Sequence, residues 1–510
     1  ANAGETGEWT RFHSSGAAPC GDYSKPMRRF FRAWLRTHYK EDEGAFKKAW
    51  NKPDKTFDTA EVPSEQEQLE AKNHTFRDPS TEQNVIDYFR CLADRCSELV
   101  VDYCRTIKEA NGGMSLAGAF YGYTMTCAYN EVFYNQGRHA PTEYSHYQRG
   151  GHLGFDRVLN SPYVDFVVSP ISYGFRGMGG DGPSAFLSGS VKLHGKLLII
   201  ENDTRLHDTP YHTRYGRANN LAESAAILRR NFSHVATHGF GAWIAPYGDS
   251  NLLSISKQFN RLGQFALQTD RKPCAEVAVL IDEESLLYES IGYNLSLDNL
   301  SHQTLQGLTR FGATFDLCHL NDFIEGRMKP YKLYLFLNAF RLDDTRRKKI
   351  KRELRRDGRT AVWVYAPGYI NNNSSIENMT DLTGFRFEKN DLPWAPFMHI
   401  VNFNHPVTKD ILQDLFWDFN AALGPLFCVQ DSEAETLGQV VYAQGSCVPG
   451  LCVKSFHEWT SIYCAVPNIP APVLRGLARF AGVHIYSDAG DVLHVSRQLL
   501  GVHTLSGGGR

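Results

Sequence analysis

The sequence predicts an α/β protein in which part of a (β/α)8 barrel is followed by a flavodoxin-like, doubly wound domain and a mixed, β-rich C-terminal domain. Between residues 114 and 270, short apolar strands alternate with helices, and each strand leads into a loop rich in Gly, Tyr or Asp. A second alternation of strands and helices follows at 275–369. Short strands then recur between residues 385 and 510.

Composition limits the classes of function. Of the 510 residues, 42% are hydrophobic and 22% are charged, which is typical of a globular protein. The net charge of −2 provides no basic field for nucleic acid. No apolar run approaches the roughly 20 residues that span a bilayer. The sequence therefore predicts neither a nucleic-acid partner nor a membrane span.

The cysteines and glycosylation sequons bear on the compartment of the protein. The eleven cysteines form no pair of CxxC motifs, so a zinc ribbon is not predicted. Asn-x-Ser/Thr triplets are compatible with a secreted or lumenal glycoprotein, although such triplets are common by chance. They begin at Asn73, Asn231, Asn294, Asn299, Asn372, Asn373 and Asn378.

Two long helices are expected near the start of the chain. Residues 24–51 have an apolar face, with Ser24 as N-cap and Pro26 in the first turn. Residues 82–110 have the same periodicity, and the two glycines that follow end the helix.

The barrel-like region, residues 1–270, is expected to hold strands four to eight of a barrel. The strands predicted after the opening one are residues 116–121, 164–168, 196–200 and 234–243, with helices at 150–161 and 219–232. A complete barrel needs eight strands. We therefore expect the first half of the barrel to be missing, because the chain is a fragment, a processed piece, or a protein whose other half is a second chain.

Two further domains are expected, at 271–370 and 371–510. In the first, the apolar strands at 276–281, 314–318, 333–337 and 360–364 predict a doubly wound sheet. Its first strand is not followed by a Gly-rich phosphate loop, so a nucleotide-using transferase is not supported. Residues 371–384 are expected to be a polar linker.

The segment GKLLIIENDTRLH, residues 195–207, is the most informative for function. A buried strand runs directly into Glu201, Asn202 and Asp203, followed by Arg205. A carboxylate just past the end of such a strand is where a β/α barrel holds its catalytic groups. The alternative is an ordinary ion pair at a solvated junction.

A second acid lies in the opening segment ANAGETGEWTRFH. Glu8 precedes Trp9, whose ring offers stacking to a pyranose and a low-polarity wall that raises the pKa of a carboxyl group. Two acids on separate strand ends are what glycoside hydrolysis requires. The alternative is a flexible, charged terminus.

These segments carry a family resemblance. The runs GGHLGFDRVLNSPYVDFVVSPISYGFRGMGGDG and SVKLHGKLLIIENDTR resemble the C-terminal half of the barrel in β-galactosidase-like enzymes close to glycoside hydrolase family 42. Residues 275–369 resemble that family's trimerisation domain. The segment WTSIYCAVPNIPAPVLRGLARFAGVHIYSD resembles the stretch that follows it.

The resemblance implies a retaining hydrolase of β-galactosides or related β-glycosides, with Glu201 as nucleophile and Glu8 as acid/base. Glu5 competes for the second role, because Gly7 replaces the Asn that usually precedes the acid/base. Arg205 or Tyr173, with help from Arg176, is expected to keep Glu201 ionised. The aromatic residues expected to contact sugar are Trp9, Tyr121, Tyr123 and Trp243. A homo-oligomer is implied by the trimerisation-like domain.

No cofactor is implied by this chemistry, and no metal site is predicted. The spacing of His152, His194 and His207 fits no common zinc pattern, so structural roles are expected for them. A catalytically inactive structural or sugar-binding protein on the same scaffold is the competing interpretation.

Overall fold

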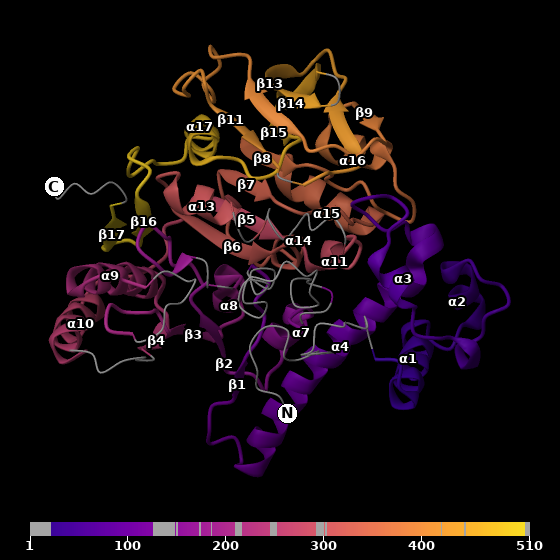
Figure 1. The fold of residues 1–510 in the computed structure, drawn as a ribbon, viewed down its shortest axis with the longest axis horizontal. Coiled ribbons are helices and arrows are strands. Elements are labelled where there is room, and N and C mark those ends of the chain that lie inside the picture. Colours follow the sequence, from indigo (N-terminus) through magenta and orange to yellow (C-terminus); the bar gives the residue numbers. More distant parts are fainter. Residues whose placement is uncertain are drawn as a thin grey trace.

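The structure is a computed structural model of the chain (Figure 1). The residues that it describes are 22–125, 148, 151–172, 175–184, 186–209, 217–244, 252–291, 300, 303–419, 421–442 and 445–504.

A helical lobe begins the described chain. Its helices are α1 (Lys25–His38), α2 (Glu43–Trp50), α3 (Glu65–Leu69) and the long α4 (Pro79–Ala110), with a 3-10 turn η1 (Phe57–Thr59). The predicted single helix over 24–51 is wrong. Lys40 and Glu41 have positive φ, and the Asp42 carboxylate accepts from the backbone N–H of Ala45 to start α2. The predicted N-cap of α1 is confirmed, because Ser24 accepts from the Met27 N–H.

Four parallel strands form the first sheet, in the order β1-β2-β3-β4. They are β1 (Gly118–Phe120), β2 (Phe166–Pro170), β3 (Leu197–Asn202) and β4 (Gly241–Ile244). The connecting and flanking helices are α7 (Phe155–Asn160), α8 (Ser188–Leu193), α9 (Leu221–His238) and α10 (Leu252–Leu267). Helices α9 and α10 cover the face of the sheet that carries Ile200 and Asn202, across an apolar cavity of about 290 Å³.

The predicted strand over 234–243 is largely wrong. Helix α9 continues through His238 and ends at Gly239, which has a φ of 70°. A glycine in this left-handed conformation is a common C-cap. The β-branched residues Val235 and Thr237 suggested a strand, but packing of the helix overrides such preferences.

The second sheet has nine strands, in the order β11-β10-β13-β14-β15-β8-β7-β5-β6. Its parallel part comprises β5 (Val277–Ile281), β6 (Phe315–His319), β7 (Leu333–Phe336), β8 (Arg359–Val364) and β15 (Trp459–Cys464). Its antiparallel part comprises β10 (Phe397–Ile400), β11 (Phe416–Asp418), β13 (Glu435–Tyr442) and β14 (Ser446–Ser455). The chain is therefore α/β with parallel sheets and a β-rich C-terminal region, and this sheet spans both predicted domains after residue 270.

Shorter elements complete this half of the molecule. The helices are α11 (Glu283–Leu286), α13 (Gln303–Arg310), α14 (Leu320–Ile324), α15 (Asp344–Leu354), α16 (Ile376–Thr383) and α17 (Ala471–Phe480). The strand pairs are β9 (Phe387–Asn390) with β12 (Leu426–Val429), and β16 (Val492–Val495) with β17 (Leu500–His503). The predicted polar linker at 371–384 is wrong, because α16 occupies most of it.

The two sheets are joined through buried groups. The Glu283 carboxylate, at the start of α11, accepts hydrogen bonds from the Thr124 hydroxyl (2.9 Å) and from the backbone N–H groups of Gly154 (3.1 Å) and Phe155 (3.0 Å). At Gly189, an added Cβ would lie 2.5 Å from the Cys318 sulfur, so only glycine lets α8 approach β6 this closely. These contacts fix the four-stranded sheet against the larger one.

Two negative findings concern the described part of the chain. Each of the nine cysteines found there is a free thiol. No helix among the described residues is long and apolar enough to cross a membrane.

The ion pair between Arg90 on α4 and Glu284 on α11 predicts a pH dependence of stability. Burial alone would raise the pKa of the Glu284 carboxyl, but the Arg90 guanidinium lowers it from 4.5 to about 2. Because the folded-state pKa lies below the unfolded one, the pair stabilises the fold above about pH 4.5 and loses this effect as the pH falls towards 2. We expect Glu284→Gln to flatten the dependence of the urea midpoint on pH in this window. The exposed Glu458→Gln control should keep the native slope, and an unchanged slope in Glu284→Gln would contradict the assignment.

Candidate active site

Glu201 lies near the carboxyl end of β3, between its register partners Pro170 on β2 and Trp243 on β4. Side chains alternate along the strand, so Leu197, Ile199 and Glu201 share one face. These three are exposed or half-buried, whereas Leu198, Ile200 and Asn202 on the other face are buried. The carboxylate therefore points to the face that is less buried along β3, which we call the open face. On β2, Val168 and Pro170, in register with Ile199 and Glu201, are buried.

An aromatic pair spans this open face. The rings of Phe120 on β1 and Trp243 on β4 meet edge to face, with centroids 6.0 Å apart. β1 and β4 are the outer strands, which in a flat sheet lie roughly 14 Å apart. The contact thus requires the sheet to curl around the face that carries Glu201. Trp243 keeps 38% of its surface exposed.

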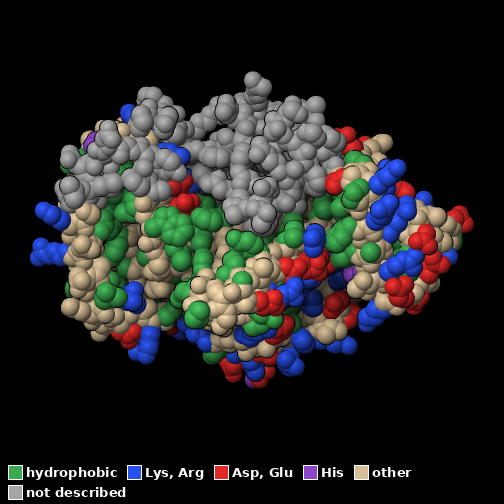
Figure 2. Space-filling view, turned by 90° about the horizontal axis from the view of Figure 1, so that it is seen from below, with side chains coloured by type: hydrophobic (Ala, Val, Ile, Leu, Met, Phe, Trp, Pro, Cys, Tyr) green, Lys and Arg blue, Asp and Glu red, His purple; other side chains and the backbone are tan. Residues whose placement is uncertain are grey.

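The surroundings of the open face are apolar. Leu197, which shares this face with Glu201 on β3, is 54% exposed. Figure 2 shows hydrophobic side chains gathered in the region of the four-stranded sheet, bordered by few charged groups. A large exposed apolar area of this kind marks a surface that binds a ligand or a partner.

A buried ion pair supports the loop after β3. The Arg176 guanidinium donates to the Asp203 carboxylate (2.8 Å) and to the Ile171 carbonyl (2.8 Å). Arg176 is fully buried and Asp203 is 3% exposed. Arg205 donates to the Asp203 backbone carbonyl at 2.7 Å. The loops that follow β2 and β3 are therefore tied together directly behind Glu201.

Helix α9 adds a second support. The Asn231 amide donates to Asn202 (3.2 Å) and to Thr204 (3.1 Å). Its neighbour Arg230 donates to the carbonyls of Arg176 (2.8 Å) and Gly177 (2.8 Å), and burial lowers the pKa of Arg230 to about 10. Because Asn231 is buried and engaged in these bonds, its sequon is inaccessible to glycosylation in the folded protein.

The other predicted site residues have different positions. Tyr121 and Tyr123 are fully buried: the Tyr121 hydroxyl donates to the Leu153 carbonyl (2.6 Å), and Tyr123 stacks on His152. The structure thus brings together Glu201 and Trp243, with Arg176 and Arg205 on the loops behind them, and places Tyr121 and Tyr123 in the core. The remaining predicted residues lie outside the described part of the chain: Glu5, Glu8, Trp9 and Tyr173.

The histidines singled out in the sequence lie apart from one another. His152 accepts from the Gly122 N–H (3.1 Å), His194 bonds Asp322 (2.8 Å) and His207 bonds Ser224 (2.9 Å). A different cluster, of His234, His238 and His494, was missed. The H-x-x-x-H spacing at 234–238 could have indicated two histidines on one face of a helix, but the segment was predicted to be a strand.

Comparison with known proteins gives a consistent result at the level of fold. No family model and no curated protein match the sequence. A β-galactosidase from Bacillus circulans sp. alkalophilus superposes with a TM-score of 0.63 at 15% identity, over 93% of this chain and 69% of that one. The fold resembles that of the β-galactosidases of glycoside hydrolase family 42.

Two further solved structures show the same likeness of fold. A cold-adapted β-galactosidase from a Rahnella species gives a TM-score of 0.61 at 12% identity, over 96% of this chain and 73% of that one. A catalytic mutant of a family 42 β-galactosidase from G. stearothermophilus gives 0.60 at 11% identity, over 94% and 69%. In each of the three comparisons the likeness covers more than nine-tenths of this chain.

We predict that Asp203→Asn destabilises the protein by about 3–5 kcal/mol, because the buried Arg176 charge loses its partner. A matched control is Asp410→Asn, which breaks the exposed pair between Arg479 and Asp410 (3.0 Å) and should cost no more than about 1 kcal/mol. Urea unfolding measures both. Equal losses in the two variants would show that the Arg176–Asp203 pair does not hold the loop.

Proposed function

We propose that this chain is a retaining glycoside hydrolase acting on β-galactosides or related β-glycosides. The observation that supports it most is the position of Glu201 at the carboxyl end of a parallel strand, on the open face and in register with an exposed Trp243. This is where barrel enzymes carry catalytic carboxylates. The fold shared with the β-galactosidases is the second support.

The proposal treats the four-stranded sheet as strands five to eight of a barrel within residues 1–270. The curl implied by the Phe120–Trp243 contact supports this arrangement. The apolar open face would then be the barrel interior, closed by other parts of the protein or by a further chain. Residues 271–370 and 371–510 would be the two following domains, the first with a role in homo-oligomer formation.

The chemistry would be a double displacement. A Glu201 oxygen attacks the anomeric carbon and forms a glycosyl ester, while a second carboxyl, Glu8 or Glu5, protonates the departing oxygen. The same group then takes a proton from the water that releases the sugar. The two carboxyl groups must lie ~5–5.5 Å apart.

Neighbouring groups would assist in this proposal. Trp243 would stack on the sugar ring, as would Trp9. Tyr173 and Arg205 would keep Glu201 ionised. Arg176 would act as a positioning residue, because its contacts hold the loops after β2 and β3 and it is buried behind the carboxylate.

Substitution of Glu201 tests the proposal. We expect Glu201→Gln to lower kcat for an activated aryl β-galactoside by at least about 10³-fold. In Glu201→Gly, azide should restore turnover and yield the α-galactosyl azide, because the small anion replaces the missing nucleophile. The exposed Glu458→Gln control should retain native rates. Native rates in Glu201→Gln would remove Glu201 from the mechanism.

A second function, sugar binding without turnover, is favoured by the aromatic pair on the open face, of which Trp243 is exposed. It predicts that galactose or a β-galactoside binds in calorimetric titration to a chain that shows no hydrolysis. Trp243→Ala should then weaken binding, while Trp394→Ala, at a tryptophan of similar exposure (44% against 38%) in the other half of the molecule, leaves it unchanged.

A further inference from the structure

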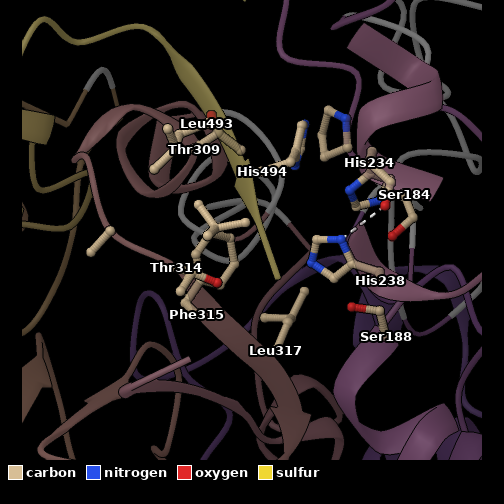
Figure 3. A pocket seen from close by; sticks show the side chains of 13 residues that line it. Ser184, Ser188, His234, His238, Thr309, Thr314, Phe315, Leu317, Leu493 and His494 are labelled. Carbon is tan, nitrogen blue, oxygen red and sulfur yellow. Dashed lines mark hydrogen bonds between the residues drawn. The ribbon is translucent and has the colours of Figure 1, made fainter. Parts of the chain in front are cut away.

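Three histidines from distant parts of the chain meet between α9 and the C-terminal hairpin (Figure 3). His234 and His238 come from α9, and His494 comes from β16. One nitrogen of each ring lies within 4.8 Å of one nitrogen of each of the others. The ring of His234 lies 4.7 Å from that of His238 and 4.8 Å from that of His494, between centroids.

Local structure explains this convergence. Residues four apart on a helix share a face, so His234 and His238 project from α9 side by side. His494 pairs across the hairpin with Gly501. A Cβ at Gly501 would lie 2.4 Å from Ser233 Cβ, so the glycine permits the hairpin to lie directly on α9. Figure 1 shows β16 and β17 beside α9, far from it in sequence.

The histidine nitrogens are buried without sufficient partners. Within the described part of the chain, neither ring nitrogen of His234 has a hydrogen-bond partner, nor does Nε2 of His494. These residues are only 7% and 6% exposed. A buried polar group without a partner costs about 1–3 kcal/mol. The cluster therefore has ring nitrogens available to a ligand that the protein itself does not supply.

The ring of His238 is oriented as in a metal site. The Nδ1–H of His238 donates to the His234 backbone carbonyl at 2.9 Å. This bond fixes the tautomer whose Nε2 carries a lone pair. A histidine that binds metal through one ring nitrogen usually donates the N–H of the other nitrogen in this way. An imidazole of ordinary pKa is mostly neutral at pH 7, and the neutral ring is the form that binds metal.

The cluster opens onto a small cavity of about 40 Å³. Hydroxyl groups of Ser184, Ser188 and Thr309 line it, beside the apolar Phe315 and Leu317. A cavity of this size holds a water molecule. It thus offers a fourth ligand position next to three imidazoles. The charged and titratable groups that act on the cluster electrostatically are Lys192, Arg230, Asp316 and His503.

We propose that His234, His238 and His494 bind a divalent transition-metal ion, Zn²⁺ by preference, which fastens the β16–β17 hairpin to α9. Three neutral imidazoles with water or a hydroxyl as fourth ligand form a tetrahedral set suited to zinc. Asp316 is the acidic group that acts on the cluster, through His238, while Lys192 and Arg230 carry the opposing positive charge. The ion would link α9, beside the first sheet, to the C-terminal hairpin, whose strand β16 also contacts α13.

The test uses the full chain, stripped of metal with EDTA and titrated calorimetrically with ZnCl₂. We expect saturable binding of one Zn²⁺ per chain, and the absorption bands of tetrahedral Co²⁺ when cobalt is used instead. His494→Gln should raise the Kd by at least about 100-fold, since even outer contacts are worth 10–100-fold. Zn²⁺ should raise the thermal midpoint and slow hydrogen exchange in residues 492–503 of the native chain but not of this variant.

Two controls keep the test decisive. His457→Gln, at an exposed histidine elsewhere, should bind Zn²⁺ as the native chain does. If His494→Gln does not fold, judged by circular dichroism without metal, His238→Gln serves for the same comparison, because His238 is less buried than the other two. Absence of saturable binding to the native chain would overturn the proposal. The proposal would also be overturned if the folded His494→Gln or His238→Gln variant bound Zn²⁺ with native affinity, or if His457→Gln lost as much Zn²⁺ affinity as that variant.

Discussion

The two-residue period of β3 is the constraint on which the proposed site depends. Because alternate side chains face opposite ways, Glu201 points to the open face while Asn202 points towards α9, where Asn231 binds it. A shift of one residue would exchange their positions. The parallel register with β2 and β4 fixes the strand, so the same hydrogen bonds that form the sheet also set Glu201 beside Trp243.

Support for this arrangement comes from groups behind the sheet. The buried pair of Arg176 and Asp203 joins the two loops next to Glu201, and Arg230 holds the loop that carries Arg176. Helix α9 therefore serves two sites at once: Arg230 and Asn231 brace the carboxylate strand, and one turn later His234 and His238 face the C-terminal hairpin. A metal ion at the histidine cluster would stabilise the helix that braces Glu201.

Much of this could be predicted from the sequence, where local pattern decides the structure. The apolar run before Glu201 produced the expected strand. Ser24 and Pro26 produced the expected start of α1, although that helix ends at His38 and not near residue 51. The prediction of a strand over 234–243 was wrong because the β-branched residues there were given more weight than Gly239, which ends helix α9. Burial of Tyr121 and Tyr123, and the approach of His494 to α9, depend on packing between distant segments. No local pattern contains that information, so the histidine cluster emerged only in the folded chain.

In the proposed mechanism, Glu201 becomes covalently bonded to the sugar during turnover. Incubation of the full chain with a 2-deoxy-2-fluoro-β-galactosyl fluoride tests this. The fluorine at C2 slows both formation and breakdown of the glycosyl ester, but the fluoride leaving group speeds its formation, so the ester accumulates. Peptide mass spectrometry should then find one fluorogalactosyl group per chain, on Glu201 within residues 197–205. A label on another carboxylate, or substrate hydrolysis without any label, would contradict the account.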